Sequence, residues 1–164
     1  FKHNELLQVG NMTIRVIHTP GHTPADLAYI INEQAAFVGD TIFMPDVGTA
    51  RCDFPGGDAN TLYDSIQTLF TLPESTDIYV CHDYPTEGRG HQFKTQVIQQ
   101  KQHNIHVNDT MIKSDFVTLR QQRDATLPMP RLILPAIQIN IRAGQMPAPE
   151  DNGTVYLKIP INLL

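Results

Sequence analysis

Residues 12–23 read MTIRVIHTPGHT, and the same kind of segment occurs twice more along the chain. Apolar and polar residues alternate over 12–18, which predicts a strand, and the Thr-Pro-Gly that follows is typical of a turn. His22 therefore comes just after the end of a strand. Residues 36–40 read AFVGD and residues 78–83 read IYVCHD, so Asp40 and His82 also follow short apolar runs.

The remaining pattern alternates strands and helices. Short apolar runs at 27–31 and 35–38 predict a hairpin of buried strands, and residues 77–81 predict another strand. Between them, apolar residues at 62, 66, 69 and 70 predict a helix that Asp58 or Asn60 caps and that ends before Pro73. Residues 92–103 and a segment from Ser114 to about 124 predict two further helices. This alternation predicts an α/β fold.

From residue 127 onward the chain is rich in proline. Prolines exclude long regular elements because they lack a backbone donor, so we expect this Pro-rich C-terminal tail to wrap an existing core. We divide the chain into residues 1–90, which carry the strand–loop motifs, and a helical and Pro-rich extension over residues 91–164 that packs on them. The tail's prolines are at positions 128, 130, 135, 147, 149 and 160.

Composition excludes several classes of protein. A net charge of −5 argues against a nucleic-acid partner, because such proteins carry a basic face. No apolar run approaches the roughly 18 residues needed to cross a bilayer, so we expect no membrane span. Two cysteines among 164 residues are too few for a disulfide scaffold, and they indicate a reducing, cytoplasmic setting.

The three strand ends suggest one site. Functional groups gather on loops at an edge of a sheet, and glycines before His22 and Asp40 permit the backbone to turn those side chains inward. Two imidazoles and a carboxylate would suit zinc or non-haem iron equally well. The competing interpretation is that each residue is an ordinary cap or turn residue, and spacing alone does not decide between the two.

Other residues receive structural interpretations. We interpret Cys52 as a small loop residue, although the neighbouring arginine could lower its pKa, and we assign Cys81 to the core at the end of a strand. His103, His106 and Asp109 recur at helical spacing, and we interpret them as a solvated helix face. Two aspartates remain open: Asp26 either braces the His22 loop or serves a turn, and Asp53 either orients Arg51 or caps a turn.

Three motifs in this order resemble the metallo-β-lactamase fold superfamily. They are Thr-Pro-Gly-His-Thr at 19–23, Phe-Val-Gly-Asp-Thr-Ile-Phe at 37–43 and Cys-His-Asp-Tyr at 81–84. The loop at 44–57, MPDVGTARCDFPGG, is most similar to the persulfide dioxygenase and glyoxalase II branch, in particular to bacterial β-lactamase-like hydrolases. Asn-Ile-His-Val at 104–107 and Leu-Lys-Ile-Pro at 157–160 resemble the same subgroup. The resemblance implies the second half of an αββα sandwich over residues 1–90.

The resemblance also implies roles for five residues. His22 and Asp40 would be metal ligands, with Fe(II) as the expected metal and Zn(II) as the alternative. His82 would have a catalytic role, as a ligand of a second metal in dinuclear hydrolases or beside a single iron in dioxygenases. Arg51 and Tyr84 would bind the glutathione part of the substrate, which agrees with the affinity of arginine for carboxylates.

One superfamily motif is missing. The His-x-His-x-Asp-His signature does not occur in these residues, so we expect it in a preceding N-terminal half of a longer protein. Without that half, the inner face of the sheet would be exposed and would promote association. The missing half is the expected partner, and a homodimer is another way to cover the face.

Three functions follow as hypotheses. The first is an iron-dependent persulfide dioxygenase that oxidises glutathione persulfide to sulfite, in sulfide detoxification. The second is a zinc-dependent thioester hydrolase of the glyoxalase II kind. The third is an inactive half-domain that pairs with another chain.

Overall fold

The computed structural model describes residues 1–159 and 161. Pro160, which the sequence analysis placed in the tail, and residues 162–164 lie outside this description. The elements are β1 (Leu6–Val9), β2 (Met12–His18), β3 (Leu27–Ile31), β4 (Ala35–Phe37), α1 (Ala59–Phe70), β5 (Asp77–Tyr79), β6 (Lys94–Gln96), α2 (Val97–His103), α3 (Lys113–Asp124) and α4 (Ile133–Asn140).

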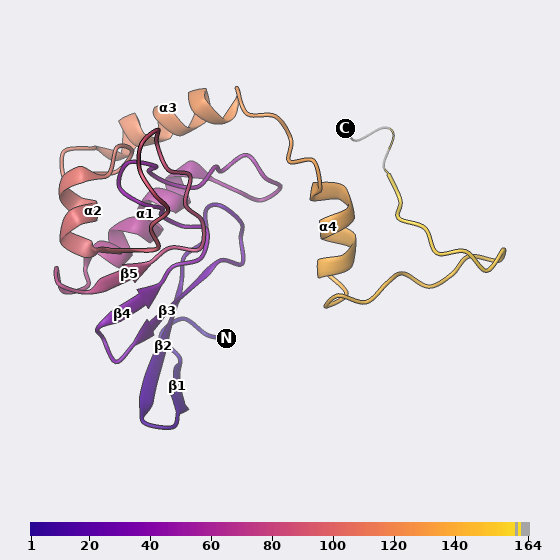
Figure 1. Cartoon of the computed structure of the whole chain (residues 1–164), viewed down its shortest axis with the longest axis horizontal. Helices are drawn as coiled ribbons and strands as arrows, with labels where there is room; N and C mark the ends of the chain where they lie inside the picture. Colours follow the sequence, from indigo (N-terminus) through magenta and orange to yellow (C-terminus); the bar gives the residue numbers. More distant parts are fainter. Residues whose placement is uncertain (160, 162–164) are drawn as a thin grey trace. The chain divides into compact units, whose positions relative to one another are not determined.

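The strands form one six-stranded sheet in the order β1-β2-β3-β4-β5-β6 (Figure 1). Neighbouring strands are antiparallel, except that β4 and β5 are parallel. Because β2 and β4 are each antiparallel to β3, they run in the same direction, and β5 follows β4. The C-terminal ends of β2, β4 and β5 therefore lie toward the same edge of the sheet, as the α/β prediction requires.

The core lies between one face of the sheet and helix α1. The side chain of Asp58 caps this helix by accepting a hydrogen bond of 2.8 Å from the Thr61 amide. The apolar residues of α1 share one side, and they pack against alternate residues of the strands. The residues in contact include Leu62, Ile66 and Leu69 of the helix and Ile17, Ala28, Ile30, Ala36 and Ile78 of the sheet.

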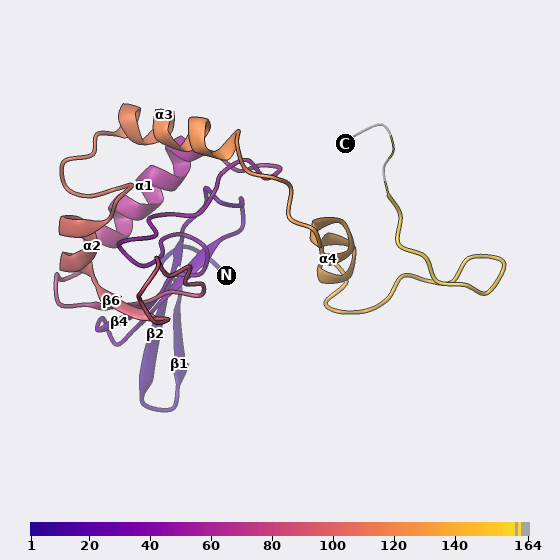
Figure 2. The same cartoon turned by 45° about the horizontal axis from the view of Figure 1, so that its top comes forward.

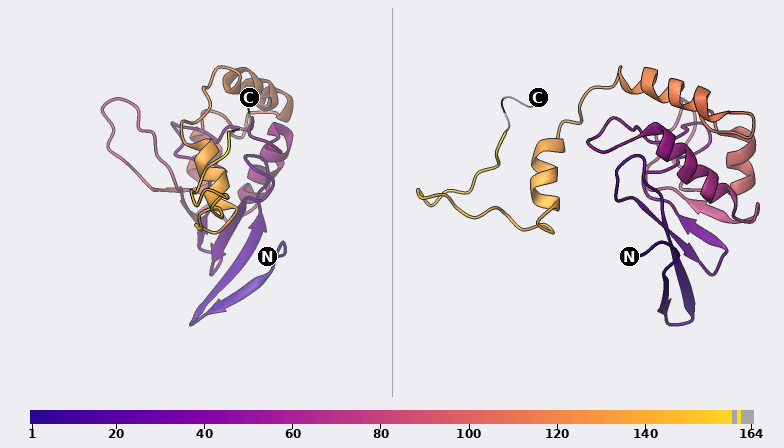
Figure 3. Two further views of the ribbon diagram at one scale, coloured as in Figure 1. Left: turned by 90° about the vertical axis from the view of Figure 1, so that its right-hand side faces the viewer. Right: turned by 180° about the vertical axis from the view of Figure 1, so that it is seen from behind.

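Helices α2 and α3 pack on α1 (Figures 2 and 3). The predicted helix over 92–103 begins only at Val97, because residues 94–96 form the edge strand β6 instead. The strand β6 has three residues, of which only Thr95 is buried, so its sequence shows no clear alternation of apolar and polar residues. Helix α3 matches the predicted segment, but its N-cap is Ile112 without a side-chain hydrogen bond rather than Ser114. The strand β1 was not predicted.

The opposite face of the sheet carries a row of aromatic rings. Phe37 on β4 is 47% exposed and stacks on Tyr79 of β5 with ring centroids 4.8 Å apart. Phe93 stacks on Tyr79 in turn, at 6.4 Å, and is also exposed. Aromatic side chains of this size are usually covered in folded proteins, so residues 1–126 by themselves leave an apolar sheet face uncovered.

The chain divides into two compact units, Phe1–Thr126 and Leu127–Leu164. Helices α2 and α3, which the sequence-based division placed with residues 91–164, contact α1 within the first unit. The second unit contains α4, and Pro135 is tolerated there because it lies in the first turn, where amide groups have no partner within the helix. No helix among the described residues is long and apolar enough to cross a membrane.

Candidate metal centre

The pairing of β4 and β5 places Asp40 and His82 at matching positions. Phe37 pairs with Tyr79 in the parallel register, and each functional residue comes three positions later. Gly39, with φ of +52°, supplies a backbone conformation that other residues rarely adopt just before the aspartate. The two loops therefore leave the sheet side by side, and their side chains converge.

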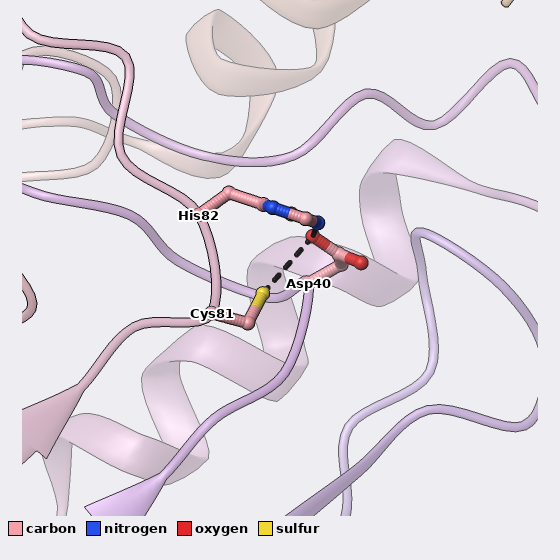
Figure 4. Close-up of side chains that lie close together, drawn as sticks. All are labelled: Asp40, Cys81 and His82. Atoms are coloured by element: carbon pink, nitrogen blue, oxygen red, sulfur yellow. Dashed lines mark hydrogen bonds and ion pairs between the residues drawn. The ribbon is translucent and has the colours of Figure 1, made fainter.

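Asp40, Cys81 and His82 form a close group of potential metal ligands (Figure 4). The Cys81 thiol donates a hydrogen bond of 3.2 Å to Asp40 Oδ1, and His82 Nε2 lies 3.5 Å from the same oxygen. All three ligand atoms lie within 4.8 Å of one another. The assignment of Cys81 to the core was wrong: strand β5 ends at Tyr79, and Cys81 is exposed on the following loop.

His22 lies on the loop after β2 and does not belong to this close group. Its Nδ1 atom is 2.7 Å from the backbone oxygen of Arg51, which leaves Nε2 as the atom that can bind a metal. The preceding Gly21 has φ of +143°, and a Cβ there would lie 2.4 Å from the backbone of Leu62. The loop thus lies directly against α1, and only glycine fits at this position.

Asp26 and Asp53, which the sequence left with two interpretations each, hold Thr23 and Arg51 in place beside His22. Asp26 accepts hydrogen bonds from the amide (2.7 Å) and the hydroxyl (2.9 Å) of Thr23, next to His22, so it braces that loop. Asp53 accepts two bonds of 2.6 Å from the Arg51 guanidinium and thereby orients it. The same guanidinium lies 5.0 Å from the centre of the Phe54 ring.

Tyr84 lies near His82, with ring centroids 6.1 Å apart, and both rings contact Phe43. The structure therefore arranges the five predicted site residues in two groups. Asp40, His82 and Tyr84 form one group, and His22 and Arg51 form the other through the 2.7 Å contact.

A charged cluster that the sequence analysis missed fixes the loop after His82. Arg89 donates paired hydrogen bonds to Asp83 and to Asp46, which joins this loop to the segment after β4. These bonds hold the pKa of Asp83 at about 2. In the sequence, the only sign of this cluster is Asp83, directly after His82. The spacing of Asp83 and Arg89 along the chain does not identify them as partners.

The loop over residues 43–52 is held by buried polar side chains. Gln100 of α2 donates to the Phe43 oxygen at 2.7 Å, and Asn104 donates to the Gly48 oxygen at 3.1 Å. The His106 Nδ1 atom accepts a hydrogen bond of 3.0 Å from the Thr49 amide. The interpretation as a solvated helix face was therefore wrong for His106, which lies beyond the end of α2 at His103 and is 4% exposed. His103 and Asp109 are exposed, as expected.

A buried ion pair on α3 completes this set, which we call the loop clamp (Gln100, Asn104, His106, Arg120 and Asp124). Arg120 and Asp124 pair one helical turn apart, with side chains 2% and 5% exposed. Arg120 donates to the Thr49 oxygen, and Asp124 accepts from the Cys52 amide at 2.8 Å. Burial raises the pKa of the Cys52 thiol to about 12, in line with its interpretation as a structural loop residue.

We expect His106 to make the stability of the protein depend on pH. Burial and the nearby charge of Arg120 lower its pKa to about 4, whereas the unfolded chain has an ordinary value near 6.5. Between these values the unfolded chain binds a proton that the native protein does not. The free energy of unfolding should therefore fall by about 1.4 kcal/mol per pH unit as pH decreases through this window. Urea unfolding at several pH values measures it.

The matched control is His103→Gln, which removes an exposed histidine at the end of α2. It should leave the pH dependence unchanged, whereas His106→Gln should flatten the curve between pH 6.5 and pH 4. An unchanged slope in His106→Gln would contradict the assignment.

The side chains at the strand ends fit a metal ion. Carboxylate, imidazole and thiolate are all ligands of zinc, and carboxylate with imidazole also suits non-haem iron. The Nδ1 contact of His22 with a backbone oxygen is the arrangement typical of metal-binding histidines, because it fixes the ring and leaves Nε2 available. The site can thus hold a metal while Arg51 and Tyr84 lie beside its loops.

Comparison with other sequences finds relatives along the whole chain. It is 52% identical over 164 residues to "Glyoxylase B2" of Dictyostelium discoideum and 50% identical over 169 residues to a probable metallo-hydrolase of Burkholderia pseudomallei. The human mitochondrial persulfide dioxygenase is 31% identical over 84% of the chain. The chain spans 56%, 58% and 51% of these relatives, or about half of their length. No family model matches the chain.

Two solved structures share the fold. The ETHE1 protein of Myxococcus xanthus superposes with a TM-score of 0.77 at 34% identity, over 88% of this chain and 60% of its own. A metallo-β-lactamase of Staphylococcus aureus superposes with a TM-score of 0.66 at 25% identity, over 79% of this chain and 39% of its own. These relatives confirm the resemblance read from the three motifs. The chain belongs to the metallo-β-lactamase fold superfamily, in the branch of its glyoxalase- and persulfide dioxygenase-like members.

Proposed function

We propose that the protein containing this chain is a metal-dependent persulfide dioxygenase that acts on a glutathione-derived substrate. The observation that carries the proposal is the convergence of Asp40 and His82 at one sheet edge, with His22 oriented by the Arg51 backbone on a neighbouring loop. The reaction would convert glutathione persulfide, oxygen and water to sulfite and glutathione. Fe(II) is the expected metal, and Zn(II) is the alternative.

The residues of this chain would have two kinds of role, metal binding and substrate binding. His22 and Asp40 would hold the metal, and His82 would lie beside it with its side chain 54% exposed. A bound Fe(II) ion would supply the site where oxygen and the persulfide sulfur react. Arg51, oriented by Asp53, offers its guanidinium to a substrate carboxylate, and Tyr84 offers a hydroxyl on an exposed ring.

The test uses the full-length protein. Metal analysis should find iron, and the iron-loaded protein should consume oxygen when it receives glutathione persulfide. Iron-loaded protein that consumes no oxygen with this substrate would contradict the dioxygenase proposal.

A zinc-dependent thioester hydrolase is the second candidate, and the position of His82 beside Asp40 favours it. A second metal ion could bind there, and a metal lowers the pKa of bound water enough to produce a nucleophile at neutral pH. Two zinc ions per chain and turnover of S-lactoylglutathione would identify the hydrolase. One iron ion and oxygen consumption would identify the dioxygenase.

Arg51→Ala tests the substrate assignment. We expect KM for glutathione persulfide to rise about tenfold, equivalent to about 1.4 kcal/mol, with kcat nearly unchanged, because the arginine would bind a carboxylate far from the reacting sulfur. Cysteine persulfide, which lacks the glutathione peptide, is the control substrate, and its KM should be the same in both proteins. An equal rise for both substrates would contradict a specific role in glutathione binding.

We also propose that the open aromatic face packs against the remainder of the longer protein. Phe37, Tyr79 and Phe93 form a continuous stacked surface, which a second sheet could cover. The third hypothesis, an inactive half-domain that pairs with another chain, uses the same face. Tight metal binding by residues 1–164 as a monomer would count against that third hypothesis.

A further inference from the structure

Cys81 lies at hydrogen-bonding distance from a predicted metal ligand. Its sulfur is 3.2 Å from Asp40 Oδ1, and His82 Nε2 is 3.5 Å from that same oxygen. In Figure 4 the thiol and the imidazole ring approach the carboxylate from two directions. The apolar run that ends at Cys81 predicts a core position, and the proposed catalytic and substrate-binding roles do not use its thiol.

These distances match those between ligands of one ion. Zinc binds sulfur at about 2.3 Å and nitrogen or oxygen at about 2.0–2.2 Å. In a tetrahedral site, a nitrogen–oxygen pair therefore lies about 3.3–3.6 Å apart and a sulfur–oxygen pair about 3.5–3.7 Å apart. The 3.5 Å between His82 Nε2 and Asp40 Oδ1 falls in the first range. The 3.2 Å between the Cys81 sulfur and the same oxygen is a hydrogen-bond distance, which has to lengthen by a few tenths of an ångström when both atoms bind one ion. The register of β4 and β5 fixes both loops, so the three side chains are brought together by the sheet itself.

We propose that Cys81 is a metal ligand that binds as a thiolate together with Asp40 and His82. This inference rests on the proposed metal site, and it takes His82 as a ligand, as in the dinuclear zinc alternative, and not as the neighbour of a single iron ion. On binding, the S–H bond breaks, the proton passes to solvent, and a sulfur lone pair forms the bond to the metal. The hydrogen bond from Cys81 to Asp40 is then replaced by the shared ion.

The second cysteine provides a matched control. Cys52 is 8% exposed and packs in the hydrophobic core, outside the close ligand group. The two cysteines of the chain therefore differ in whether they lie next to Asp40 and His82, and each can be replaced separately.

The experiment is cobalt substitution in the full-length protein. A thiolate bound to Co(II) gives an intense near-ultraviolet charge-transfer band, which carboxylate and imidazole ligands do not give. We expect this band in the wild-type protein and in Cys52→Ala, and we expect its loss in Cys81→Ser. If a cysteine elsewhere in the full-length protein were the ligand instead, the band would persist in Cys81→Ser. Persistence of the band in that variant would therefore contradict the proposal.

Alkylation provides a second measurement that does not need a Cys81 variant to fold. In Cys52→Ala, iodoacetamide should label Cys81 of the metal-free protein slowly, because burial and the Asp40 carboxylate raise the pKa of its thiol to about 12. Over an incubation long enough to label the metal-free protein fully, bound zinc should suppress labelling at least tenfold by mass spectrometry. Cobalt bound without a charge-transfer band, or labelling unaffected by bound zinc, would overturn the thiolate ligand while leaving the proposed metalloenzyme intact. Failure to bind iron, zinc or cobalt at all would overturn both.

Discussion

Asp40→Ala is expected to remove bound metal from the full-length protein and to lower its turnover at least about 100-fold. Asp40 is the only carboxylate in the close ligand group of the described residues, and both Cys81 and His82 converge on one of its oxygens. Loss of residues that merely orient metal ligands costs about 10–100-fold, so loss of a ligand should cost at least as much. Metal content per chain and turnover of glutathione persulfide measure the two effects.

The control for this variant is Asp64→Asn, which changes an exposed carboxylate on α1 that pairs with Lys113. It should keep the metal content and turnover of the wild-type protein. A folded Asp40→Ala protein with normal metal content would show that the carboxylate is not a ligand, and the site would then have to be sought elsewhere.

Asp124→Asn is expected to lower the free energy of unfolding by about 3–5 kcal/mol. The substitution leaves the Arg120 guanidinium buried without its countercharge, at a position where its side chain is 2% exposed. It also weakens the acceptor for the Cys52 amide, which Asp124 binds at 2.8 Å. Chemical denaturation, followed by circular dichroism, gives the change in stability.

Glu33→Gln is the matched comparison because it breaks an ion pair at the surface. Arg15 and Glu33 pair with side chains 25% and 55% exposed, and pairs in such positions contribute about 0–1 kcal/mol. The two variants should therefore differ by at least about 2 kcal/mol. Equal effects would mean that the α3 ion pair is solvated rather than buried.

The sequence predicted the elements whose periodicity is strong. Strands at 12–18 and 27–31 and the helix at 59–70 occur as expected. The strand at 27–31 and the helix each bury one face, which gives their sequences a clear period. The strand at 12–18 alternates in sequence, but its neighbours Val16 and Ile17 are both buried. The strands β1 and β6 escaped prediction because they are short and mostly exposed, so pairing with a neighbour rather than burial determines them.

The candidate site was partly predictable for a related reason. Strand ends identified Asp40 and His82, and the parallel register of β4 and β5 brings them together. Cys81 was misassigned because its strand ends two residues earlier than its apolar run. His106 was misassigned because helical spacing does not reveal where a helix stops, and the loop that it binds lies 57 positions away.

The loop clamp also limits how this site can diversify. Loops usually tolerate insertions and deletions, since their backbones face water. Here side chains of α2 and α3 bind backbone atoms at successive points from Phe43 to Cys52, and a Cβ on Gly48 would lie 2.1 Å from the His106 ring. One added residue would shift these atoms out of register and displace Arg51. If Arg51 binds substrate as proposed, substrate preference would evolve here by exchange of side chains, while the length of the loop stays fixed.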